Sequence, residues 1–106
     1  SGLIMKAFNS VGIELPHSSK MQSKLGEKVT KNEALPGDLI FFSSPKSKKK
    51  VGHVGIITSV SETGIQFIHA AFKGGIKYDN LASAYYMKHF MMIKRNLFPK
   101  ETRQNQ

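Results

Sequence analysis

Two strand-like segments, each carrying a histidine, constrain this chain more than any other feature. Residues 51–57 and 65–70 are rich in Val, Ile and Phe, and the Ser- and Gly-containing stretch 59–64 between them is typical of a tight turn. The pattern therefore predicts a β-hairpin with His53 in its first strand and His69 in its second.

The geometry of such a hairpin predicts that both imidazoles lie on one side of the sheet. A turn centred on Ser61 places His53 directly opposite His69, and a turn centred one residue later makes them diagonal neighbours. In either register the side chains are about 5–8 Å apart. An offset of one residue in a single strand would send them to opposite faces, so the hairpin is a testable prediction.

Helical patterns come first in the chain and strand patterns later. Apolar residues recur at helical spacing over 3–11, and Ser19 with Gln22 forms a capping-box pattern, so two helices are expected, ending near Gly12 and Gly26. The other expected segments are strands at 39–42, 76–78 and 90–93, a polar connection over 27–35 that could include a short turn, a lysine-rich loop over 43–50 and a helical turn or loop over 81–89. Short turns between strands imply antiparallel pairing. The sequence thus predicts an α+β fold, with N-terminal helices packed on an antiparallel β-sheet of about five strands.

Size and charge narrow the classes of function. A chain of 106 residues is one domain, and none of its apolar runs approaches the length of a transmembrane segment. The net charge of +9, with a run of lysines over 46–50, favours an anionic partner such as nucleic acid, an acidic membrane surface or a cell-wall polymer, or serves solubility alone. The chain carries no recognised nucleic-acid-binding motif and most of its aromatic residues fall at core-like positions, so we expect no nucleic acid as partner.

Paired histidines have three plausible uses. A Zn²⁺ site needs at least three protein ligands, and with no cysteine in the chain either Asp38 or Asp79 would have to lie nearby. Alternatively, His53 and His69 are ordinary structural histidines. In the third use one is a catalytic base and the other orients it, which requires a nucleophile that the chain does not obviously contain.

Four blocks of sequence resemble the NlpC-type cell-wall peptidases, a papain-like family of cysteine hydrolases. The blocks are S-G-L-I at 1–4 with its following helix and G-I-E-L-P-H-S-S at 12–19, L-P-G-D-L-I-F-F at 35–42, G-H-V-G-I at 52–56, and F-I-H-A at 67–70. They occur in the family's order at similar spacings. The resemblance implies a papain-like peptidase domain over residues 1–98, followed by a polar tail over 99–106.

The resemblance also implies where the nucleophile belongs. The family motif Asp-Cys-Ser-Gly overlaps this chain at Ser1 and Gly2, so the cysteine would immediately precede Ser1, and the 106 residues as written are not expected to hydrolyse anything. A thiol at the start of a helix has a lowered pKa. The candidate catalytic residues are then His53, as the base paired with the thiolate, and His69, as its orienting partner.

Four further residues match family positions near the substrate. The candidate substrate-binding residues are Ser1, His17, Ser18 and Ser19. Ser19 also suits the cap of the second predicted helix, and His17 stands where many relatives carry Arg. Asp38 is expected to order a turn rather than to catalyse, and His89 to be exposed.

By resemblance, then, the chain is a cysteine endopeptidase domain acting on peptidoglycan stem peptides or muropeptides. Such enzymes cleave the amide bond between D-γ-glutamate and a diamino acid through a thioester acyl-enzyme, and need no cofactor or metal. The implied location is the bacterial cell envelope or the exterior. The alternative is a catalytically inactive, basic cell-wall-binding or interaction module of the same fold, and the residue preceding Ser1 distinguishes the two.

Overall fold

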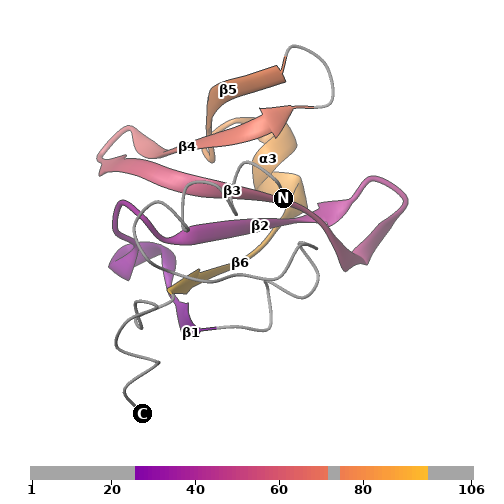
Figure 1. Cartoon of the computed structure of the whole chain (residues 1–106), viewed down its shortest axis with the longest axis horizontal. Helices are drawn as coiled ribbons and strands as arrows, with labels where there is room; N and C mark the ends of the chain where they lie inside the picture. The colour runs from indigo at the N-terminus through magenta and orange to yellow at the C-terminus, as the bar shows by residue number, and fades with distance from the viewer. Residues whose placement is uncertain (1–25, 72–74, 96–106) are drawn as a thin grey trace, which may run out of the picture.

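A computed structural model describes residues 26–71 and 75–95, which form a six-stranded antiparallel sheet with a short helix (Figure 1). The elements are β1 (Glu27–Val29), the 3-10 turn η1 (Lys31–Glu33), β2 (Leu39–Ser44), β3 (Ser47–Ser61), β4 (Gly64–Ala71), β5 (Gly75–Asn80), α3 (Ala84–His89) and β6 (Phe90–Arg95). The strand order is β1-β6-β2-β3-β4-β5. The helices expected before residue 26 lie outside the described residues. In the described part, no helix has the length and apolarity needed to cross a membrane.

Antiparallel pairing is confirmed, but two expectations for local structure were wrong. The segment expected to be a polar connection contains β1, which pairs with β6 through Val29 and Ile93 and makes the sheet six-stranded rather than five-stranded. The expected lysine-rich loop is the end of a hairpin, in which Ser44 of β2 pairs with Ser47 of β3. Neither segment alternates apolar and polar residues, because β1 is very short and the lysines of β3 are exposed.

Strand β2 lies inside the sheet and is buried on both faces. Successive side chains of a strand point to opposite faces, so Ile40 and Phe42 contribute to one core cluster and Leu39 and Phe41 to another. The first cluster is Val29, Ala34, Ile40, Phe42, Ile57, Ile65, Phe67, Leu81 and Ile93. Tyr86 of α3 packs against this first cluster, which identifies the face that the helix covers.

The turn before β2 is held by a buried carboxylate. Asp38, only 3% exposed, accepts hydrogen bonds of 2.8 Å from the Nε and Nη2 atoms of Arg95 and from the backbone N–H of Leu35. Bidentate pairing of this kind is among the stronger ion-pair geometries, and its hydrogen bonds raise the pKa of Arg95. Asp38 therefore orders the turn and fastens it to β6.

Candidate active site

A β-bulge sets the register that brings the two histidines together. Next to the turn, Ser61 pairs with Gly64 and Ser59 with Gln66, whereas beyond Thr58 the pairs are Ile57 with Phe67 and Ile56 with Ile68. If the register of the turn continued without interruption, His53 and His69 would lie on opposite faces. The extra residue, Thr58, shifts the pairing by one, so the imidazoles are diagonal neighbours on one face.

The two imidazoles are in direct contact. Nε2 of His53 lies 2.7 Å from Nδ1 of His69, a hydrogen-bond distance, and the rings are nearly perpendicular with centroids 4.9 Å apart. His69 is 1% exposed, whereas His53 is half-buried. The pairing expected from the hairpin is therefore present, in its diagonal form.

Gly55 makes room for this arrangement. A Cβ atom at Gly55 would lie 2.9 Å from the ring of Phe67, 3.0 Å from the carbonyl oxygen of Ile68 and 3.4 Å from Cβ of His69. The first two distances are shorter than ordinary contacts, and the carbonyl belongs to the backbone of the neighbouring strand. The glycine two residues after His53 thus allows β4 to present His69 at this point.

Two residues that the sequence did not single out for catalysis lie behind His69. Asp79 Oδ2 is 2.7 Å from His69 Nε2, and the hydroxyl of Tyr86 donates to the same oxygen at 3.2 Å. The register of β4 and β5 pairs Phe67 with Asp79 and His69 with Lys77, which places Asp79 diagonally from His69. Given the pairing of β4 with β5, the diagonal rule used for the histidines leads to Asp79. Nothing in the sequence indicated where α3 brings Tyr86.

The surroundings favour a neutral His53 beside a charged Asp79. Burial, and then the charge of His69, lower the pKa of His53 from 6.5 to about 4. Partial burial acts to raise the pKa of Asp79, but hydrogen bonds from His69 and Tyr86 and the charge of Lys77 bring it below its ordinary value. Burial and the adjacent Asp79 raise the pKa of Tyr86 to about 12, so its hydroxyl stays protonated. Near neutral pH the site thus holds a neutral His53 imidazole and a hydrogen-bonded, ionised Asp79 carboxylate.

Of the remaining candidate residues, the structure describes only His89. Ser1, His17, Ser18 and Ser19 lie outside the described residues, so their role stays a prediction. His89, expected to be exposed, is half-buried with its Nδ1 2.9 Å from Oγ of buried Ser43, because α3 packs beside β2.

The contacts of the His69 ring are relevant to whether the two histidines could bind a metal ion. Both of its ring nitrogens are within hydrogen-bond distance of protein atoms, one of His53 and one of Asp79. Across residues 26–71 and 75–95, no group of three His, Asp or Glu side chains is placed to hold a metal ion.

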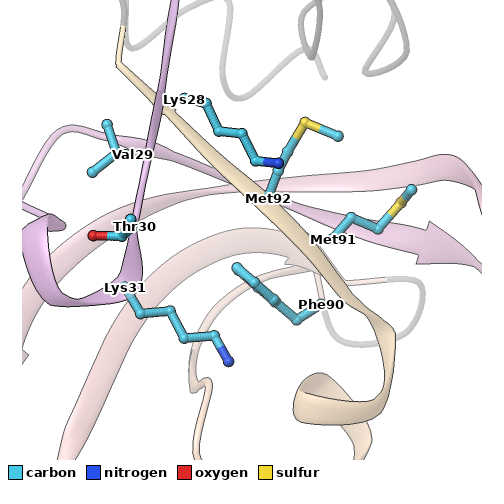
Figure 2. Close-up of a pocket in the computed structure, with 7 residues that line it drawn as sticks. All are labelled: Lys28, Val29, Thr30, Lys31, Phe90, Met91 and Met92. Atoms are coloured by element: carbon cyan, nitrogen blue, oxygen red, sulfur yellow. The ribbon is translucent and has the colours of Figure 1, made fainter.

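A pocket of about 390 Å³ is lined by residues of β1, β6 and the segment that follows β1 (Figure 2). Its lining residues are Lys28, Val29, Thr30, Lys31, Phe90, Met91 and Met92. The ammonium of Lys31 lies 4.5 Å from the ring centroid of Phe90. Strand β2 separates this pocket from β3 and β4, and the lining includes no histidine or carboxylate. The lining of this pocket therefore lacks the imidazole pair on which the candidate active site is built.

Comparison with known proteins gives consistent matches. Residues 1–95 match the NlpC/P60 family. The chain is 36% identical over 83 residues to the probable endopeptidase NlpC of Escherichia coli K12. This alignment covers 78% of this chain and 51% of that protein. The chain is 34% identical over 95 residues to the bifunctional muramidase/DL-endopeptidase CwlT of Bacillus subtilis 168, covering 90% of this chain and 27% of that protein.

A solved structure shares the fold. The crystal structure of an NlpC/P60 family protein from Bacillus cereus ATCC 10987 superposes with a TM-score of 0.79 at 28% identity, over 92% of this chain and 31% of that one. The chain thus spans about half, or less, of the length of these three proteins.

Proposed function

Because this chain belongs to the NlpC/P60 family, we propose that it is a cysteine endopeptidase domain that hydrolyses peptidoglycan stem peptides. Relatives named as endopeptidases, among them one named for a DL-endopeptidase activity, support the substrate class. The observation that carries the proposal is the 2.7 Å contact between His53 and His69 on the α3 face of the sheet, with Asp79 behind it. A linked pair of this kind is the base and orienting partner that a thiol hydrolase requires.

In this mechanism the nucleophile is a cysteine immediately before Ser1. Its thiol gives its proton to His53, and the thiolate attacks the carbonyl carbon of the amide between D-γ-glutamate and the diamino acid. The C–N bond breaks as the leaving amine takes the proton from His53, which leaves a thioester. Water, deprotonated by His53, then attacks the thioester carbonyl. The C–S bond breaks and the leaving thiolate takes the proton from His53, which releases the acid and regenerates the thiol and the neutral base.

His69 acts in this scheme by holding the base. An imidazole hydrogen-bonded through one nitrogen presents the other in a fixed direction, and the contact also determines which nitrogen carries the proton. Burial of His69 beneath α3 restricts its own rotation. His53, half-buried at the end of the chain of contacts, is the member available to a substrate.

One feature favours a second candidate, an inactive wall-binding module. Lys46, Lys48, Lys49 and Lys50 are all exposed in the β2–β3 hairpin, where they suit an anionic wall polymer. The identity of the residue before Ser1 in the natural protein separates the two candidates. Cysteine supports the peptidase, whereas Ser, Ala or Gly there supports the module. Both assign the protein to the cell envelope or the exterior.

The direct test extends the chain by Asp-Cys before Ser1 and measures cleavage of purified muropeptides by mass spectrometry. We expect products cut after D-γ-glutamate, and no products from the His53→Ala variant. The matched control is His89→Ala, which removes an imidazole outside the His53–His69 contact and should remain active. Cleavage by a correctly folded His53→Ala variant would rule out His53 as the base.

A further inference from the structure

Building on the proposed function, we propose that Asp79 is a positioning residue that fixes the proton on the outer nitrogen of His69 and thereby leaves Nδ1 of His53 bare to act as the base. Tyr86 completes the arrangement by holding the carboxylate. The contacts run through four side chains, His53, His69, Asp79 and Tyr86, drawn from β3, β4, β5 and α3.

Which nitrogen carries each proton follows from what each group can donate or accept. An ionised carboxylate only accepts, so Nε2 of His69 carries the proton shared with Asp79 at 2.7 Å. In its neutral form His69 has one N–H, so its Nδ1 is then an acceptor and the proton of the 2.7 Å contact belongs to Nε2 of His53. Neutral His53 then has a free lone pair on Nδ1. This is the nitrogen that can accept a proton from a thiol.

Tyr86 holds the carboxylate from the side of the helix. Its ring packs against both Phe42 and Phe67, at centroid distances of 5.1 Å from each, and its hydroxyl donates to Asp79 Oδ2 at 3.2 Å. The raised pKa of Tyr86 keeps this donor protonated. Lys77 approaches the same oxygen at 3.5 Å, but its side chain is half exposed, so its contribution is weaker.

A purely structural role for Asp79 is the competing explanation, since it would also link β5 to β4. Those strands already share a continuous ladder of backbone pairs from Gln66–Asn80 to Ala71–Gly75. The carboxylate is 26% exposed, so it is not required to fill the core. The decisive readout is therefore the tautomer of His53, which a structural link alone would not set.

The test uses the 106-residue chain itself, with long-range ¹H–¹⁵N NMR of the imidazoles at neutral pH. We expect the Nε2–H tautomer of His53 in the wild type. In Asp79→Ala the hydroxyl of Tyr86, 3.4 Å from His69 Nε2, becomes the donor to that nitrogen. The proton of His69 then moves to Nδ1 and that of His53 to its own Nδ1, so the tautomer of His53 should reverse.

Two further variants keep the test decisive. Asp79→Asn, which conserves shape, offers both a donor and an acceptor and should give a mixture of His53 tautomers. Lys77→Gln is the control and should leave the wild-type tautomer. An unchanged Nε2–H tautomer of His53 in folded Asp79→Ala or Asp79→Asn overturns the inference.

Enzyme kinetics of the chain extended by Asp-Cys provide an independent test. We expect Asp79→Ala to lower kcat by roughly 10- to 100-fold with KM within about twofold, below the roughly 10⁴-fold effect of a carboxylate that contacts the base directly. An unchanged kcat would overturn the inference. If the extended wild type hydrolyses nothing, the proposed function fails while the NMR result still decides the role of Asp79.

Discussion

Gly55 illustrates how the absence of one side chain can define a site. The space that its Cβ would occupy is bounded by the Phe67 ring and the backbone carbonyl of Ile68, next to the Cβ of His69. A ring can shift, but the carbonyl is held in the sheet. The strand can therefore accommodate a larger residue at position 55 only by moving β4, and with it His69.

We accordingly predict that Gly55→Ala lowers the free energy of unfolding by about 1–3 kcal/mol, as overpacking of a core does. Denaturant unfolding measures the loss, and the imidazole NMR signals of His69 should shift with it. Gly37→Ala is the comparison, because its Cβ meets no atom within 4 Å and only its φ of +96° is strained. That variant should lose stability without altering the His69 signals. Wild-type stability and signals in Gly55→Ala would contradict this account of the strand.

His53 should also make stability depend on pH. Its pKa is about 4 in the folded chain and 6.5 as the reference for an unfolded one, so the unfolded state takes up a proton first as the pH falls. The stabilising contribution is therefore complete above pH 6.5 and is lost progressively down to about pH 4. Denaturant unfolding of the wild type at pH 7 and pH 5 should show this decrease.

The matched variant is His53→Gln, whose amide can still donate to His69 but does not titrate. Its stability should change less between pH 7 and pH 5 than that of the wild type, while the contribution of Asp79 is shared by both proteins. Equal decreases in the two proteins would show that His53 does not have a lowered pKa.

The β3–β4 hairpin determines whether the histidines meet. Its turn and its histidine-bearing half have registers that differ by one residue, and Thr58 absorbs the difference. The hydroxyl of Thr58 donates to the carbonyl oxygen of Gln66 at 3.2 Å, so the bulged residue is also fastened to the partner strand.

Deleting Thr58 should therefore preserve the site, because the pairs Ile57–Phe67 and Ser59–Gln66 then become consecutive in a regular ladder. We expect the His53 and His69 imidazole signals of the deletion variant to match those of the wild type, with the sheet intact by circular dichroism. Loss of the contact between the imidazoles in a folded deletion variant would show that the bulge does more than reconcile the two registers.

Strand-forming residues and turn composition predicted this hairpin. The expected common face of His53 and His69 is present, but it depends on the bulge at Thr58, which the sequence analysis did not predict. Asp79 follows from the diagonal rule once the pairing of β4 with β5 is known, but the sequence alone did not define that register. Tyr86 depends on where α3 packs, and β1 depends on its pairing with β6, which are tertiary contacts without a local signal. The end of the β2–β3 hairpin was predicted to be a loop for a related reason, because its exposed lysines give the strands no apolar pattern.

The two faces of the sheet carry different groups of residues. One face carries α3 and the chain of contacts from Tyr86 to His53, while the other carries the cluster of Leu39, Phe41 and Val54. The described residues thus bring the candidate base and the side chains behind it together from four consecutive elements, β3, β4, β5 and α3 (Figure 1). The proposed peptidase requires that the start of the opening helix bring its cysteine to Nδ1 of His53.

The most direct measurement of that requirement is the pH dependence of iodoacetamide alkylation in the chain extended by Asp-Cys before Ser1. We predict a thiol pKa below about 7, compared with about 8.5 for a free cysteine. In His53→Ala the pKa should rise by at least about one unit, while His89→Ala should leave it unchanged. A thiol that titrates near 8.5 and does not respond to His53→Ala would contradict the account.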